Sequence, residues 1–157
     1  MNIIYKEKVP TYVFVTAILL ITCIILLIIL MSQLTSKPIV LDLGGKVILL
    51  IVLIFNIVVL FYFRELVIIV TESRILFGFG KFRKKFYTGN IESIEIDDYK
   101  FSNYLGYGIR YGRDKSIGYV PRGGKGLRMK FKNEKRIYFF STDRPDELKL
   151  LLEKYIK

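Results

Sequence analysis

The 157-residue chain has no histidine and only one cysteine, Cys23. A single cysteine cannot form a disulfide within the chain, which fits a reducing compartment. Histidine is the commonest general base and metal ligand, so its absence removes the usual centre of such chemistry. The phosphate-binding pattern G-x-x-x-x-G-K-[ST] is also missing, because PRGGKG (121–126) lacks its first glycine and its hydroxyl. We therefore expect a protein that is not an enzyme, with no catalytic residue, metal or cofactor.

Two other features could suggest chemistry. Four acidic residues gather at Glu92, Glu95, Asp97 and Asp98, but strand alternation places Glu95 and Asp97 on a polar face, which we interpret as solvated surface. We interpret Arg110 in GIRYG as structural, although a buried arginine could also hold a carboxylate.

Charge is segregated along a chain that is 52% hydrophobic, with mean hydropathy +0.38 and net charge +11. Residues 1–63 contain four lysines and two acidic residues. Residues 64–157 therefore contain 21 of the 25 Lys and Arg and 12 of the 14 Asp and Glu. An apolar part followed by a basic part indicates a membrane protein with a basic soluble domain.

Two apolar runs predict transmembrane helices. Residues 12–31 carry no charge and would span about 30 Å as a helix, the thickness of the hydrocarbon core. This run is too long for a signal peptide. Residues 47–63 contain one polar residue, Asn56, and Gly44-Gly45 before them predicts a turn. The hairpin then has an N-terminal cytoplasmic segment (1–11) and an external loop (32–46).

The second helix should end near Arg64. Two charges, Arg64 and Glu65, would each cost about 2.5 to 3.5 kcal/mol near the centre of a bilayer. Aromatic residues at 61–63 are typical of the membrane interface. The β-branched run LVIIV after Glu65 predicts that a strand begins directly, without a flexible linker.

Asn56 and Cys23 are the unusual members of the two apolar runs. Asn56 could form an interhelical hydrogen bond between two copies of the chain, or a modest bond within one hairpin. We interpret Cys23 as a small apolar filler.

Residues 64–157 alternate as strands do. In GLRMKFK, Leu127, Met129 and Phe131 share one face and basic residues share the other. NIESIEIDDY and KKFYTGN predict further strands. Near the C-terminus, RPDELKLLLEKYIK has Pro145 and two acidic residues at its start and leucines at helical spacing, which predicts a final helix.

Several strands followed by one helix form the layout of a pleckstrin-homology-like (PH-like) domain. The stretch VTESRILFGFGKFRKKFYTGNIESIEI resembles the opening of the bacterial PH-like domains found in small membrane proteins, with Thr71, Arg74, a glycine, a basic stretch and Ile91 with Ile94. GYGIRYG, YVPRGGKGLRMKF and STDRPDEL resemble later elements of that family. The resemblance covers residues 66–155 and departs from the family in its more basic 81–85 turn and PRGGKG (121–126). It implies an α+β antiparallel barrel or sandwich capped by a helix over 64–157, and no settled activity.

Basic residues are the best candidates for a binding surface. KFRKK and PRGGKG together predict contacts to anionic lipid or phosphate at Lys81, Arg83, Lys84, Lys85, Arg122 and Lys125. The same residues could instead be a solvated face that serves only as a topology signal. Nucleic acid is a less favoured partner for a tethered domain. The expected function is a membrane-anchored binding or scaffold module that contacts anionic lipid, a protein partner or a second copy. The alternative is an accessory subunit of a larger membrane complex.

Basic residues near the helix ends predict the topology. Lys6, Lys8 and five basic residues within 64–84 flank the hairpin on one side, so both termini should lie in the cytoplasm of a plasma-membrane protein. Protease added outside intact cells should then leave the C-terminal domain uncut, and cleavage of that domain would contradict this topology.

Overall fold

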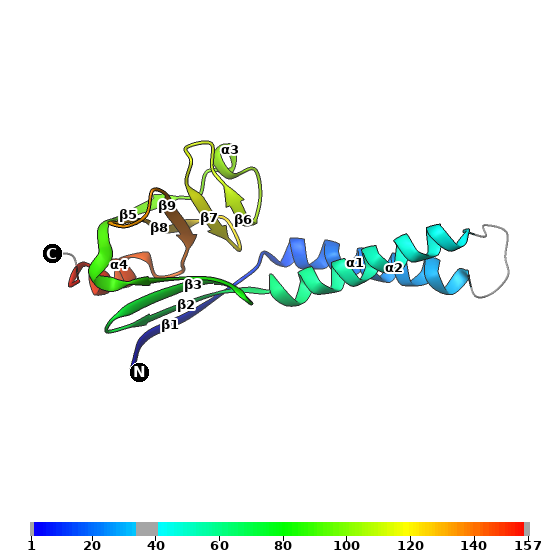
Figure 1. The fold of residues 1–157 in the computed structure, drawn as a ribbon, viewed down its shortest axis with the longest axis horizontal. Helices are drawn as coiled ribbons and strands as arrows, with labels where there is room; N and C mark the ends of the chain where they lie inside the picture. Colours follow the sequence, from blue (N-terminus) through cyan, green and yellow to red (C-terminus); the bar gives the residue numbers. More distant parts are fainter. Residues whose placement is uncertain (1, 34–40, 156–157) are drawn as a thin grey trace.

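A computed structural model describes residues 2–33 and 41–155 as two parts, a hairpin of two helices and a β-rich domain at one end of it (Figure 1). The helices are α1 (Val13–Ser32) and α2 (Leu43–Tyr62), and both are long and apolar enough to cross a membrane. The predicted helices at 12–31 and 47–63 therefore exist. The middle of the predicted loop, residues 34–40, lies outside the described residues.

The start of α2 differs from the prediction. Asp42 caps this helix, because its side chain accepts a hydrogen bond of 2.9 Å from the backbone N–H of Gly45. The cap draws Gly44 and Gly45 into the first helical turn. The prediction that these glycines form a turn before the helix is wrong.

The hairpin is held by a narrow seam between the two helices. Cys23 and Leu53 are its buried apolar residues, and the Cys23 thiol donates to Oδ1 of Asn56 at 3.6 Å. Asn56 thus makes an interhelical contact within one hairpin. Most other large apolar side chains of α1 and α2 are exposed.

One sheet contains a strand from each side of the hairpin. Its order is β1 (Ile3–Pro10), β2 (Glu65–Thr71), β3 (Arg74–Phe79) and β4 (Phe82–Tyr87), and every neighbouring pair is antiparallel. The helix α2 ends at Tyr62 and β2 begins at Glu65, so the predicted change from helix to strand at Arg64 is confirmed. The N-terminal segment (1–11), for which the sequence predicts no strand, contains β1, which forms an edge of this sheet.

The second sheet has the order β5-β8-β9-β7-β6. Its strands are β5 (Ile91–Asp98), β6 (Gly108–Tyr111), β7 (Ile117–Val120), β8 (Lys125–Phe131) and β9 (Ile137–Ser141), of which β7 and β9 are parallel neighbours. A short 3-10 helix, η1 (Thr88–Asn90), leads into it from β4, and α3 (Phe101–Tyr104) lies between β5 and β6. Leu127, Met129 and Phe131 are buried on β8, as the alternation predicts.

The core lies between the two sheets and is rich in aromatic rings. Phe77 of the first sheet stacks on Phe140 of the second at a centroid distance of 4.5 Å, and Phe86 stacks on Phe131 at 3.9 Å. The predicted final helix is α4 (Pro145–Glu153), which packs on β5 and β8 through the fully buried Leu148 and Leu152. The layout of two mostly antiparallel sheets and a C-terminal helix is thus confirmed.

A buried carboxylate fastens β1 to the start of α4. Glu7 accepts hydrogen bonds from the hydroxyls of Tyr5 (2.7 Å) and Thr142 (2.6 Å) and from the backbone N–H of Asp143 (2.7 Å). Burial, together with the neighbouring Glu7, raises the pKa of Tyr5, which keeps the phenol a donor. The residues before the hairpin are thereby part of the domain.

Glu7→Ala should therefore destabilise the whole domain. It leaves the Asp143 N–H and the Thr142 hydroxyl without their acceptor, so the free energy of unfolding should fall by about 1 to 3 kcal/mol. Chemical denaturation of the full chain in detergent measures the change. The control is Lys6→Ala, an exposed position on the same strand, and equal stability of the two variants would contradict the role of Glu7.

Candidate functional site

The candidate site lies where the hairpin meets the domain, which we call the hairpin base. Here the backbone N–H of Thr11 donates to the carbonyl of Arg64, and that of Tyr12 donates to the carbonyl of Pro121, each at 3.0 Å. The Thr11 hydroxyl also donates to the carbonyl of Phe63. Both ends of the hairpin are therefore joined directly to the sheets.

Aromatic rings surround the hairpin base. Phe63 packs on Phe79 at 5.2 Å and on Phe82 at 5.9 Å between ring centroids, and Tyr12 stacks on Tyr107 at 6.0 Å. Of these rings, the tyrosines are of the type that favours the boundary between hydrocarbon and water. The ring contacts join the ends of the hairpin to the domain.

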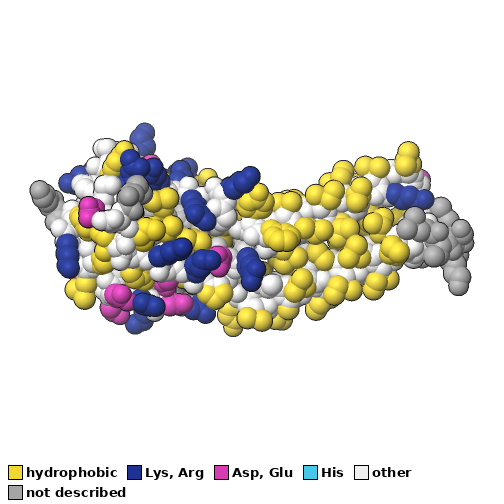
Figure 2. Space-filling view, turned by 90° about the horizontal axis from the view of Figure 1, so that it is seen from below, with side chains coloured by type: hydrophobic (Ala, Val, Ile, Leu, Met, Phe, Trp, Pro, Cys, Tyr) yellow, Lys and Arg dark blue, Asp and Glu magenta, His cyan; other side chains and the backbone are white. Residues whose placement is uncertain are grey.

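The outer face of the first sheet is basic along both of its edges. Strand alternation and register place two rows of residues on this face, the first nearer to the hairpin. The rows are Lys8, Val67, Gly78 and Arg83, and then Lys6, Ile69, Leu76 and Lys85. Figure 2 shows Lys and Arg side chains gathered over the domain up to the start of the apolar hairpin.

The first row borders a hollow of about 260 Å³, which we call the basic pocket. Three cationic side chains line it, Lys8 from β1, Arg64 from the end of α2 and Arg83 from β4. Its one carboxylate is Glu65, which Lys8 binds at 2.6 Å. Arg64 and Arg83 make no ion pair with any of the described residues, so the pocket keeps an excess of positive charge that suits an anion.

The turn between β3 and β4 closes the pocket beside Tyr62. Gly80 lines the pocket and adopts φ +45°, a left-handed conformation that glycine accepts without strain. Lys81 follows and places its ammonium 5.9 Å from the centre of the Tyr62 ring, a cation–π contact. The pocket therefore joins the basic turn to the aromatic end of α2.

The six basic residues predicted to contact an anion do not form one surface in the structure. Arg83 and Lys85 lie on the outer face and Lys81 lies in the turn, whereas Lys84 belongs to the opposite face of β4. Arg122 is paired with Asp143. Lys125 is exposed at the start of β8, in the other sheet.

Two pocket residues, Lys8 and Arg64, were not among the predicted contacts. The signal for Lys8 was its alternation with Tyr5, Glu7 and Val9, the buried side of β1. Arg64 was interpreted only as the end of a helix. Register across the sheet, which local sequence does not reveal, brings Lys8 and Arg83 to one row.

Several other basic residues are neutralised on the second sheet. Arg128 binds Asp114 at 2.6 Å and lies 3.7 Å from Asp97, and Lys130 binds Glu92 at 2.6 Å. Burial opposes ionisation of Asp114, but hydrogen bonds from Ser116 and Arg128 hold its pKa well below the usual range. These charges are satisfied internally and are poor candidates for a ligand.

The remaining sequence candidates are exposed or lie in ion pairs. Arg110 is exposed, and its Nε donates to the carbonyl of Tyr107 at 2.7 Å. Of the predicted acidic group, Glu92 and Asp97 are in ion pairs. Within residues 2–33 and 41–155, no three Cys, Asp or Glu side chains are grouped as metal ligands.

Compared with known proteins, the chain matches no family model, and no curated protein or solved structure is significantly similar to it. The PH-like resemblance of residues 66–155 remains a prediction, and a fold alone would not determine the function.

Gly80→Ala should disturb the basic pocket. A methyl group there would lie 2.6 Å from Cδ1 of Tyr62, and φ +45° adds roughly 1 to 2 kcal/mol of strain. We expect a loss of at least about 1 kcal/mol of stability in chemical denaturation of the full chain. Gly89→Ala is the matched control, because no heavy atom lies within 4 Å of its added methyl group. Equal effects of the two substitutions would contradict this role of Gly80.

Proposed function

We propose that this protein is a membrane-anchored, non-enzymatic binding or scaffold module, in which a basic PH-like domain contacts the anionic surface of the plasma membrane. The observation that carries the proposal is the basic pocket at the hairpin base. Lys8, Arg64 and Arg83 converge there, directly beside the aromatic end of α2. Each basic residue that reaches an anionic surface contributes about 1 kcal/mol.

Exposure of the helices supports the membrane anchor. Two helices of 20 residues, each about 30 Å long, leave most of their apolar side chains uncovered. Water would make this exposure costly, whereas hydrocarbon of the same thickness removes the cost. The pairing of β1 with β2 puts both strands at one end of the hairpin, and the basic flanks favour the cytoplasmic side.

Distance along the sheet decides which cations can reach the bilayer. Lys8 and Arg83 are level with Val67, two residues or about 7 Å beyond the start of β2. Lys6 and Lys85 are level with Ile69, about 13 Å beyond it, which exceeds the Debye length of about 8 Å at physiological salt. The first row therefore suits lipid headgroups better than the second.

The second row favours the alternative function. Lys6 and Lys85 extend the basic face beyond the Debye length, where salt screens the bilayer and an acidic protein surface is a better partner. An accessory subunit of a larger membrane complex would use this part of the face and the uncovered apolar sides of α1 and α2.

Docking on anionic lipid should depend on the first row. With the 157-residue chain in lipid nanodiscs, anionic lipid at low salt should slow amide hydrogen exchange in the β3–β4 turn relative to neutral lipid. High salt should remove this protection. The double variant Lys8→Gln/Arg83→Gln should lose it even at low salt.

The matched control is Lys84→Gln/Lys132→Gln, which removes the same charge from exposed lysines off the outer face and should keep the protection. Equal exchange in neutral and anionic nanodiscs would overturn the lipid contact. Protection that high salt leaves unchanged would overturn docking by surface charge.

A further inference from the structure

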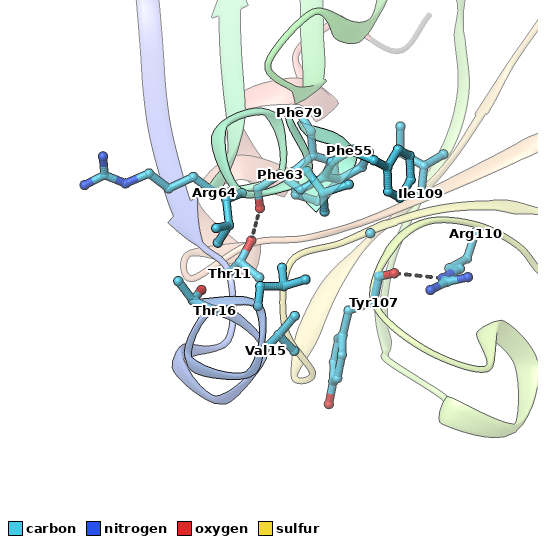
Figure 3. Close-up of a pocket in the computed structure, with 14 residues that line it drawn as sticks. Thr11, Val15, Thr16, Phe55, Phe63, Arg64, Phe79, Tyr107, Ile109 and Arg110 are labelled. Carbon is cyan, nitrogen blue, oxygen red and sulfur yellow. Dashed lines mark hydrogen bonds between the residues drawn. The ribbon is translucent and has the colours of Figure 1, made fainter. Parts of the chain in front are cut away.

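A second hollow, distinct from the basic pocket, lies between the hairpin and the second sheet. It has a volume of about 390 Å³, within the range of small-molecule sites. We call it the junction cavity. Figure 3 shows its lining from both helices and the domain, with Val15 of α1, Phe55 of α2, Phe79 of β3 and Ile109 of β6 among the labelled residues.

The walls of the junction cavity are mostly apolar and continue into the hairpin. Val15 and Leu19 line it from α1, and Phe55 and Val59 line it from α2. From Phe55 to Phe63 the cavity follows α2 for eight residues, or about 12 Å. A hollow of this shape has few groups that can hold water, so an apolar occupant is favoured.

The end nearest the domain carries the polar groups. Arg110 lines this end, and Figure 3 shows its Nε bonded to the Tyr107 carbonyl. That bond leaves the charge of Arg110 without a carboxylate partner among the described residues, and no Asp or Glu lines the cavity. Arg64 contributes its side-chain stem, while its guanidinium points away from the cavity (Figure 3).

We propose that the junction cavity binds one anionic membrane lipid, with an acyl chain between α1 and α2 and the headgroup beside Arg110. The apolar walls favour a chain, and the unpaired cation at the domain end favours a negatively charged headgroup. The apolar end of the cavity lies within the hairpin and its cationic end lies at the hairpin base. A lipid in the cavity would therefore have the same orientation as the lipids of the surrounding bilayer, with its headgroup towards the domain. This lipid is held between hairpin and domain, whereas the docking proposed above concerns the outer face of the first sheet.

Photo-crosslinking of the full chain in nanodiscs tests the proposal. The probe is phosphatidylglycerol with a diazirine near the end of one acyl chain, present as a minor component in phosphatidylcholine. Peptide mapping should find the label concentrated on Leu19, Phe55 and Val59. Unlabelled phosphatidylglycerol should compete with the probe more effectively than added phosphatidylcholine, and Arg110→Gln should abolish that difference.

Two matched pairs of substitutions distinguish the cavity from the ordinary lipid shell. Val15→Phe and Val59→Phe fill the cavity and should each remove most of its label. Val13→Phe and Val58→Phe, at exposed positions on the same helices, should leave it unchanged. Equal labelling of both sides of the helices, or labelling that survives both cavity-filling variants, would overturn the proposal.

A further variant separates this inference from the docking function. Lys8→Gln/Arg83→Gln changes the basic pocket and leaves the lining of the junction cavity intact. Label in the cavity should therefore persist in a variant that has lost hydrogen-exchange protection of the β3–β4 turn. Loss of both signals in that variant would show that the cavity is not an independent site.

Discussion

The pairing of β1 with β2 is the constraint on which the rest of the structure depends. The chain leaves the first sheet at Pro10, forms both long helices and returns at Glu65, directly opposite its point of departure. The hydrogen bond from Thr11 to the Arg64 carbonyl continues this pairing up to the helices. No flexible linker separates the hairpin from the domain on either strand. The basic pocket and the junction cavity therefore lie between a hairpin and a domain whose relative position is fixed.

The same sheet determines which positive charges are available to a ligand. A net charge of +11 suggests a uniformly basic surface. Strand alternation places the basic residues on different faces, however, and ion pairs neutralise several of them. Arg128, Lys130 and Arg122 bind carboxylates of the domain itself, whereas Arg64 and Arg83 converge without such a partner among the residues that the structure describes. Because an ion-paired cation must lose one partner to gain another, Arg64 and Arg83 would contribute most to the proposed binding of an external anion.

Local patterns predicted the elements, and nonlocal pairing produced the site. Length and hydropathy were enough for α1 and α2, the charges at Arg64 and Glu65 for the end of the second helix, and alternation for β8. Alternation along residues 5–9 was the local signal of β1, but its partner β2 lies more than fifty residues later and its buried side includes the charged Glu7. The basic stretch 81–85 looked continuous in sequence, yet the period of two in β4 separates Lys84 from Arg83 and Lys85. The neutralisation of Arg122 by Asp143 likewise depends on the folded chain.

The two proposed lipid contacts would act through different forces at the same junction. Attraction of the outer face to anionic headgroups is screened by salt and changes with lipid composition. An acyl chain in the junction cavity is held by burial of apolar surface, about 0.8 kcal/mol for each CH₂ group, which salt hardly affects. Arg64 lines both hollows, and its carbonyl accepts the hydrogen bond from the Thr11 N–H. A shift of either occupant would therefore displace the same residue between hairpin and domain. The hairpin base is therefore the place where the composition of the membrane would determine how the domain is oriented on it.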